Sequence, residues 1–168
     1  MSTNRAQVGR KEVRETLYNF INVPNVEGIN QVFTSFPKRI DFNVNALPGE
    51  MNRCAAVIFI ESETESRIAV GGAHNGWKRI DYGVIVQLFH HSLERNAEDA
   101  MANFDNVIDA LKEHLRSDHN FGDPNGNLVW QGAEPAIDCL YGEPVSQKAT
   151  STETWASLSF IVTQMIQG

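Results

Sequence analysis

The sequence predicts an α+β domain, with a mainly antiparallel or mixed sheet that includes a β-meander. An N-terminal helix and one long central amphipathic helix are expected to pack on this sheet. Three observations support this fold class. Apolar residues recur at helical spacing in two separate segments, and the segments that follow each of them carry strand patterns. The chain has 168 residues, of which 42% are hydrophobic, so it is long enough for one domain, residues 1–168, with a sizeable core.

The first helix is predicted over Ala6–Asn22 and is ended by Pro24. Residues 1–5, ahead of it, are expected to be flexible. Residues 23–51 form a long connecting segment, because they contain three prolines and no sustained periodicity, and a short strand is expected near Gln31–Thr34. Connections of this length are uncommon in small domains and are often functional.

The meander is predicted from three consecutive strands. Cys54–Ile60 is apolar at odd and even positions alike, which indicates a central strand that is covered on both faces. The polar residues Glu61–Ser66 are interpreted as a turn, and Arg67–Val70 as the second strand of a hairpin. A glycine-rich turn, Gly71–Gly76, leads to the third strand, Trp77–His90. One face of this strand is expected to carry Tyr82, Val84, Val86 and Leu88, and the other Ile85 and Phe89.

The central helix is predicted by a long apolar stripe whose members are spaced 4, 3, 4, 3 and 4 residues apart: Ala97, Met101, Phe104, Ile108, Leu111 and Leu115. Asn96 is expected to cap its first turn. Strands are then predicted at Asn127–Gly132, Ala136–Tyr141 and Thr154–Ile166, with a loop over Gly142–Ser151. In the last strand Ala156, Leu158, Phe160 and Val162 are expected to share one face.

Composition excludes several classes of protein. The 14 Lys and Arg against 21 Asp and Glu give a net charge of −7, the wrong sign for binding nucleic acid through its phosphates. Cys54 and Cys139 belong to no CxxC or Cys/His cluster, so neither a disulfide framework nor a zinc finger is expected. The polar N-terminus and the absence of an apolar run of about 18 residues predict a soluble protein without a membrane partner.

The most metal-like feature is the pair His90-His91, with His74 on a nearby turn. Neighbouring residues of a strand point to opposite faces, so the pair does not converge on one ion. The glycines of GGAHNG join two strands instead of leading into a helix, which argues against a phosphate-binding loop. Neither cysteine is marked as a nucleophile. No cofactor, metal or catalytic residue is therefore predicted, and the protein is not expected to be an enzyme.

Three further groups of charged or aromatic residues were considered as functional candidates. The central helix carries five carboxylates off its apolar stripe, as solvated helix faces commonly do: Glu98, Asp99, Asp105, Asp109 and Glu113. The carboxylates of Glu61, Glu63 and Glu65 fit a soluble hairpin tip, or, in a ring, an acidic pore lining that keeps DNA from adhering. Trp77, Trp130 and Trp155 fit either the core or an interface.

The order of elements resembles the tail terminator (neck) proteins of long-tailed bacteriophages from about Arg10 onward. The resemblance is carried by RIAVGGAHNGWKRIDYGVIVQLFHHS and by LKEHLRSDHNFG followed by LVWQGAE. In that family an Arg-rich turn ends the helix, and a Gly and a short strand finishing in Gly-Glu follow. The counterparts here are Arg116-Ser117-Asp118, Gly122 and Gly132-Ala133-Glu134, with one alanine inserted. The long segment from Val26 to Met51 and the loop Gly142–Ser151 depart from the family pattern.

The resemblance implies a subunit of a self-assembled ring, usually a hexamer, in the tail-neck region of a virion assembled in the host cytoplasm. Its partners would be the major tail tube protein and a head-tail connector or stopper protein, with DNA passing through without specific binding. Glu61, Glu63 and Glu65 are then candidate pore-lining residues. The candidate interface residues are Trp77, Arg79, Phe121, Trp130 and Trp155.

Three alternatives stay open. One is another head-tail connector or tail-completion subunit of similar fold, which would contact the connector instead of the tube. A second, of a different class, is a small-molecule or metal-binding domain that uses His74, His90 and His91. A third is a cellular scaffold subunit unrelated to phage.

Overall fold

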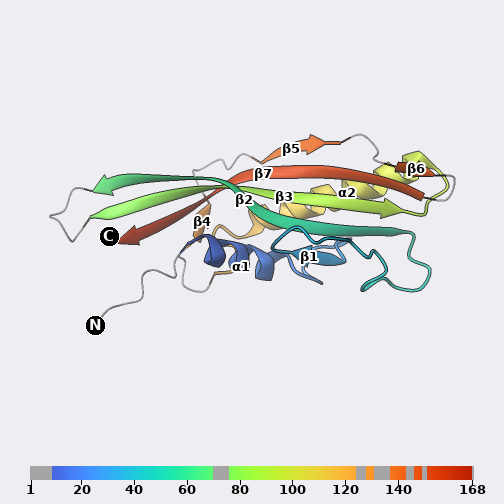
Figure 1. Ribbon diagram of the computed structural model, residues 1–168, viewed down its shortest axis with the longest axis horizontal. Helices are drawn as coiled ribbons and strands as arrows, with labels where there is room; N and C mark the ends of the chain where they lie inside the picture. The colour runs from blue at the N-terminus through green and yellow to red at the C-terminus, as the bar shows by residue number, and fades with distance from the viewer. Residues whose placement is uncertain are drawn as a thin grey trace.

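The computed structural model describes residues 9–69, 76–123, 128–130, 137–142, 146–148 and 151–167. Two helices and seven strands follow one another in this part of the chain (Figure 1): α1 (Arg10–Ile21), β1 (Gln31–Phe33), β2 (Asn52–Ala69), β3 (Trp77–Ser92), α2 (Ala97–Ser117), β4 (Leu128–Trp130), β5 (Asp138–Tyr141), β6 (Ser146–Lys148) and β7 (Ser151–Gln167). The fold is α+β, with an N-terminal and a central helix, as the sequence predicts.

The seven strands form one mixed sheet. Its main order is β1-β2-β3-β7-β4, and β5 and β6 also pair with β7 along the same edge as β4. Strand β1 is parallel to β2, whereas all other pairs are antiparallel. The long central strands β2, β3 and β7 have 18, 16 and 17 residues, about three times the length of an average strand.

Both helices pack into one core on the same face of the sheet. The predicted face of β3 is confirmed, because its apolar members are buried there: Tyr82, Val84, Val86 and Leu88. The predicted face of β7 is confirmed by the burial of Ala156, Leu158, Phe160 and Val162. Helix α1 contributes Val13, Leu17 and Ile21 to the same core, and α2 contributes Phe104, Ile108, Leu111 and Leu115. The helices touch each other where His114 Nε2 contacts the Phe20 carbonyl oxygen at 2.7 Å.

The expected turn at Glu61–Ser66 is wrong. These residues continue β2 without interruption, and each of Ser62, Thr64 and Ser66 has a partner on β3. The segment looks like a turn because its side chains are exposed on both faces, so it shows no apolar alternation. A β-bulge between Ile60 and Ser62 shifts the register at this point. The two short strands predicted over Cys54–Ile60 and Arg67–Val70 therefore belong to one long strand, β2, whereas the predicted third strand is confirmed as β3.

The other boundaries differ less. Strand β1 confirms the short strand expected near Gln31–Thr34, and helix α1 begins at Arg10, within the predicted range. The predicted loop Gly142–Ser151 is wrong in part, because it contains β6 and the first residue of β7. The glycine-rich turn after Val70 lies outside the described residues, apart from Gly76.

The central helix is confirmed, and its N-cap is Asn96, whose Oδ1 accepts a hydrogen bond from the Glu98 backbone N–H at 3.0 Å. Its apolar stripe differs at the first turns, where Met101 is 37% exposed and Ala100 is buried instead. The predicted stripe advances 3.6 residues per step on average, as an α-helix does, so it follows one face of the helix. The buried face is centred differently at the first turns, where Ala100 precedes Phe104 by four residues.

Candidate assembly surface

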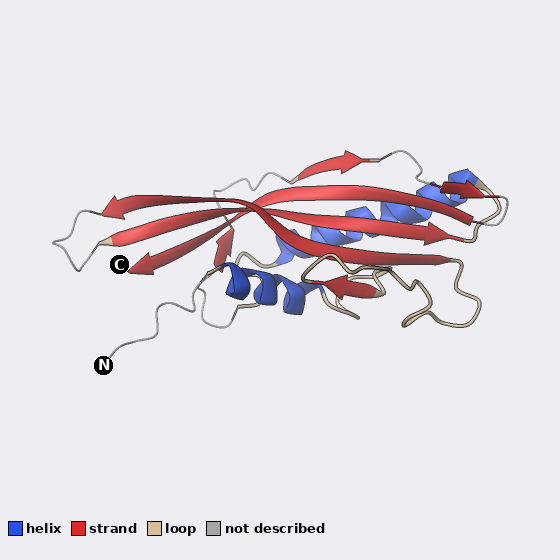
Figure 2. Ribbon diagram, viewed as in Figure 1, coloured by secondary structure: helices blue, strands red, loops and turns tan. Residues whose placement is uncertain are grey.

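The three long strands project beyond both helices at one end of the molecule. This projection, here called the arm, consists of residues 61–69 of β2, 77–82 of β3 and 163–167 of β7 (Figure 2). The register joins all three strands up to the pairs of Trp77 with Ala69 and Gln167. The arm is therefore a three-stranded sheet, joined by β4 at its base beside Thr163 and Gln164, that both helices leave largely uncovered.

Polar contacts brace the base of the arm, one within the sheet and one to helix α1. Tyr82 is buried there, and its hydroxyl donates a hydrogen bond to Gln164 Oε1 at 3.2 Å. Burial, and to a lesser degree the charge of Glu63, raises the pKa of Tyr82 to about 12, so this hydroxyl stays protonated. Arg10 of α1 donates to Glu63 Oε2 at 2.6 Å. These contacts orient the arm relative to the core.

The opposite face of the arm carries a cluster of hydrogen-bonded polar side chains and, next to it, exposed apolar side chains. Asp81 Oδ1 accepts hydrogen bonds from Arg79 Nε at 2.9 Å and from Thr163 Oγ1 at 2.8 Å, which ties β3 to β7. Next to this polar cluster, Ile161 is 46% exposed and Met165 is 41% exposed. Trp77, at the end of β3, is 44% exposed. Large apolar side chains that remain in water on a projecting sheet make this face a candidate contact surface.

The end of the arm carries an excess of positive charge. Arg67 and Lys78 are direct partners across β2 and β3, an arrangement that places like charges opposite each other. Lys78 Nζ lies 2.7 Å from Glu65 Oε1, which neutralises one of the two. Within the described residues no ion pair is found for Arg67. The charge of Arg67 is therefore available to an external acidic group.

The three candidate pore-lining carboxylates lie on this arm and not on a hairpin tip. Glu63 and Glu65 are opposite Tyr82 and Ile80, so they share the face that the helices cover at the base. Glu61 is the additional residue at the β-bulge, and it lines a shallow hollow with Ser62 and Asp138. Their spacing in the sequence suggests one face, and the bulge separates Glu61 from the other two.

A second exposed surface lies on α2 and β5. The solvent side of α2 presents Asp105, Asp109 and Glu113 at intervals of four residues, which brings like charges together on one helix face. Asp105 and Asp109 lie close enough to β5 to help raise the pKa of Tyr141, after the larger effect of its burial. On β5, Leu140 is 65% exposed and Tyr141 is 50% exposed. An acidic row thus borders an exposed apolar pair.

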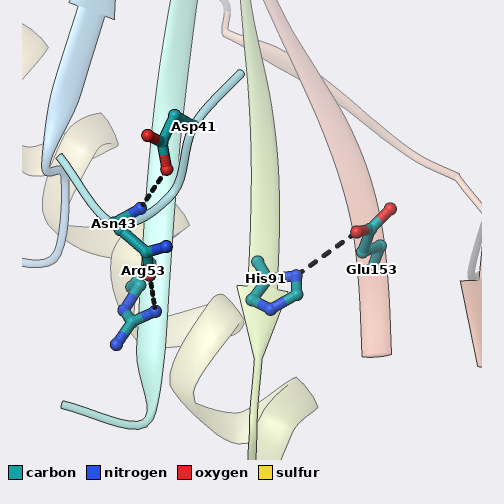
Figure 3. Close-up of polar contacts among 5 residues, drawn as sticks. All are labelled: Asp41, Asn43, Arg53, His91 and Glu153. Atoms are coloured by element: carbon teal, nitrogen blue, oxygen red, sulfur yellow. Dashed lines mark hydrogen bonds and ion pairs between the residues drawn. The ribbon is translucent and has the colours of Figure 1, made fainter. Parts of the chain in front are cut away.

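The two adjacent histidines point to opposite faces, as the sequence predicts. His90 is buried beneath α2, where its Nε2 lies 3.0 Å from Asn103 Oδ1 and its ring stacks on Phe104. Burial lowers the pKa of His90 below its usual value. His91 lies on the other face, with its Nδ1 3.3 Å from Glu153 Oε1 (Figure 3). His74 lies outside the described residues.

The surroundings of His91 hold the long connecting segment on the sheet. The Phe42 ring stacks on His91 at a centroid distance of 5.1 Å. Arg53 Nη1 donates to Asn43 Oδ1 at 2.8 Å, and Asp41 Oδ1 accepts from the Asn43 backbone N–H at 3.0 Å (Figure 3). These polar side chains position a loop. In the part of the chain that the structure describes, no group of three or more His, Cys, Asp and Glu side chains has the arrangement of a metal site.

The remaining candidate interface residues differ in their surroundings. Phe121 is wrong as an interface residue, because it is 1% exposed and packs edge-on against Phe20 in the core. Arg79 is engaged by Asp81, and Trp155 is half-buried, with its carbonyl oxygen accepting from the Gly142 backbone N–H at 2.9 Å. Trp130 lies on β4, paired with Val162. Of the five candidates, Trp77 is the most clearly exposed in the described structure.

Sequence reasoning missed most of the exposed apolar residues. Ile161 and Met165 lie on the otherwise polar face of the last strand, and this break in the alternation is the signal that marks them. Leu140 and Tyr141 have no comparable signal, because a four-residue strand is too short to show its parity.

Comparisons with known proteins give the chain no family. Neither a protein-family model nor a curated protein matches its sequence. Among the described residues no helix is long and apolar enough to span a membrane.

Proposed function

We propose that this chain is a structural subunit of a virion: a tail terminator that forms a ring on the completed tail tube. The observation that supports this proposal best is the arm, which projects beyond the helices (Figure 2) and exposes Trp77 and Met165. A projecting sheet with uncovered apolar side chains is suited to docking on other subunits, and its residues perform no bond-making chemistry in this function.

The mechanism is capping by surface complementarity. One face of the ring matches the end of the tube, and its other face denies the next tube ring a docking site and offers a site to the head-tail connector or stopper protein. Each contact can be weak on its own, because several symmetric copies bind together and their free energies add. The polar contacts of Tyr82 and Asp81 brace β3 against β7 within the arm, and Arg10 of α1 ties it to the helical layer, which lowers the entropy lost on binding.

DNA passage adds an electrostatic requirement. A ring around the path of DNA needs a lining that does not bind phosphate, and carboxylates meet this need by repulsion. Glu63 and Glu65 project from the same face of the arm and are the pore-lining candidates that a single surface can present together. Each is paired with a cation, Arg10 or Lys78, so these ion pairs would have to open for the two carboxylates to repel phosphate. Glu61 would contribute only where the opposite face also borders the channel.

The test is assembly with the tail tube protein encoded by the same genome. The purified chain is measured alone and with polymerising tubes, by light scattering for mass and by electron microscopy for shape. We expect rings at one end of tubes whose growth has stopped. A chain that stays monomeric and leaves tube growth unchanged would overturn the proposal. Binding only to the connector would instead identify a different head-tail joining subunit.

A matched pair of variants connects this test to the arm. In a combined arm variant, Met165→Ser removes exposed apolar surface from the arm, and Ile161→Ser removes it from β7 beside the base of the arm, whereas Leu47→Ser removes it from the long connecting segment. We expect the arm variant to lose capping while Leu47→Ser retains it. Equal capping by both variants would remove the arm from the mechanism.

A further inference from the structure

The outer edge of β2 is open along the arm. Strand β1 pairs with this edge, and its last residue, Phe33, lies opposite Val57. In the described part of the chain no strand continues this pairing along residues 58–69, whereas the other margin of the sheet is paired with β4, β5 and β6 as far as Gln164. Residues 61–67 are exposed, and they project past both helices (Figure 2). An open edge presents unpaired backbone N–H and C=O groups to another strand.

The backbone groups that point outward along the arm are those of Glu63, Glu65 and Arg67. Successive residues of a strand direct these groups to alternate sides. Cys54 directs its carbonyl oxygen outward, where it accepts a hydrogen bond from the Asn30 backbone N–H at 2.8 Å. The first β-bulge of β2 moves the outward positions from even to odd residue numbers. A second bulge follows Arg67, so the regular open edge runs over residues 62–67.

The side chains along this edge favour one kind of partner strand. One face of the edge carries the small hydroxyl side chains of Ser62, Thr64 and Ser66, which leave room for a neighbouring strand. The other face carries Glu63, Glu65 and Arg67. Charged residues on an edge discourage pairing with strands that do not match them. An antiparallel copy of the same edge presents these charges in reverse order, so it can set Arg67 against a glutamate.

We propose that two copies of the chain pair antiparallel through this edge, with Glu65 opposite Glu65 of the partner subunit. Arg67 then lies opposite Glu63 of the partner subunit on both sides of the two-fold axis, and among the described residues no other ion pair is found for Arg67. The two Glu65 carboxylates meet at the axis, but each has Lys78 Nζ 2.7 Å away. An axis at Thr64 would oppose Glu63 to Glu65, and an axis at Ser66 would shorten the ladder against the second bulge.

This inference goes beyond the proposed function and does not rest on it. A contact between identical patches closes at two copies, whereas a ring needs a contact between different patches. The strand register places Trp77 and Met165 on the face of the arm opposite to Glu63, Glu65 and Arg67, so pairing through the edge leaves both uncovered. The proposed contact therefore describes the free chain, before it meets the tail tube.

The experiment is a scan of single cysteine substitutions along the edge. Directly opposed, hydrogen-bonded residues of antiparallel strands have a Cα–Cα distance of about 5.5 Å, which a disulfide can span. We expect Glu65→Cys to form a disulfide-linked dimer under mild oxidation, at least tenfold more than Thr64→Cys or Ser66→Cys alone. In the proposed register these last two positions lie opposite each other, so a mixture of the two variants should cross-link. The wild type, whose Cys54 and Cys139 are free, is the background control.

A matched pair of variants tests the backbone contact. Glu65→Pro removes an outward N–H, whereas Glu65→Thr removes the same carboxylate but keeps this N–H. We expect Glu65→Pro to dimerise at least tenfold more weakly by sedimentation velocity and Glu65→Thr to dimerise as the wild type does, and circular dichroism establishes that both are folded.

The outcomes separate this inference from the proposed function. A monomeric wild type, undiminished dimerisation of Glu65→Pro, or cross-linking of Thr64→Cys or Ser66→Cys alone that equals that of Glu65→Cys would overturn the inference. A dimer that leaves tube growth unchanged would support the inference and overturn the terminator function, and a monomer that caps tubes would do the reverse.

Discussion

The same three strands form two regions with opposite properties. Where the helices cover the sheet, Val84, Val86 and Leu88 of β3 are at most 1% exposed. In the arm, only a few residues earlier on β3, Trp77 is 44% exposed and its neighbours carry charge. One strand therefore passes from a core environment to a surface environment, and its sequence changes from apolar alternation to charged and aromatic residues.

The difference between the two regions predicts which residues determine stability and which determine assembly. Side chains in the covered half contribute through buried apolar area, about 25 cal/mol per Å². Side chains of the arm leave that area available to a partner. Substitutions in the covered half should therefore change the free energy of unfolding, and those in the arm should change assembly with little effect on stability.

The largest expected effect on stability is that of Phe104→Ala on α2. Phe104 is 1% exposed and stacks on His90, so its removal leaves a cavity and costs about 3–5 kcal/mol. Urea unfolding followed by circular dichroism measures this change. Met101→Ala, on the exposed side of the same helix, is the control and should cost less than about 1 kcal/mol. Equal costs would contradict the burial of the covered half.

A smaller effect is expected for Gly28→Ala in the connecting segment. Gly28 has φ +90°, and a Cβ at this position would lie 2.5 Å from Val107 Cγ2 on α2. Backbone strain and overpacking together should cost about 1–3 kcal/mol. Gly49→Ala is the control, because it has φ +80° but an open environment, so the difference in unfolding free energy isolates the contact with α2. No difference between the two would show that this segment does not press on the helix.

Acid should destabilise the covered half through His90. Burial lowers the pKa of His90 in the folded state, so below about pH 6.5 the unfolded chain takes up a proton that the folded chain resists. Stability is then present above this pH and is lost as pH falls. His90→Gln keeps a side chain able to pair with Asn103 but does not titrate. The melting temperature of the wild type should fall more steeply between pH 7.5 and 5 than that of the variant, and parallel curves would contradict this assignment.

Sequence patterns were sufficient to predict the helices and strands of the covered half. Helix α2, the buried face of β3 and the buried face of β7 are all read from apolar spacing, because one face of each element is in water and the other is in the core. The same reasoning failed in the arm, where Glu61–Ser66 has water on both faces and therefore no periodicity. Only the pairing with β3, a contact distant in sequence, identifies this segment as a strand.

The candidate assembly surface was likewise predicted only in part from the sequence. Trp77 was identified as an aromatic residue at a strand start, and it is exposed on the arm. Phe121 was misplaced, because residues near a helix end can face either the core or solvent, and its contact with Phe20 comes from α1.

The smallest expected effect on stability belongs to Trp77→Ser, which also tests the comparison most directly. Trp77 lies at the end of β3 with almost half of its surface in water, so its loss should change the free energy of unfolding by less than about 1 kcal/mol. Its effect on ring assembly should be far larger, because aromatic residues at the centre of an interface contribute much of the binding free energy. Urea unfolding and sedimentation velocity on one preparation measure both quantities. A large loss of stability with unchanged ring assembly would place Trp77 in the core, and the arm would then be an extension of the covered half.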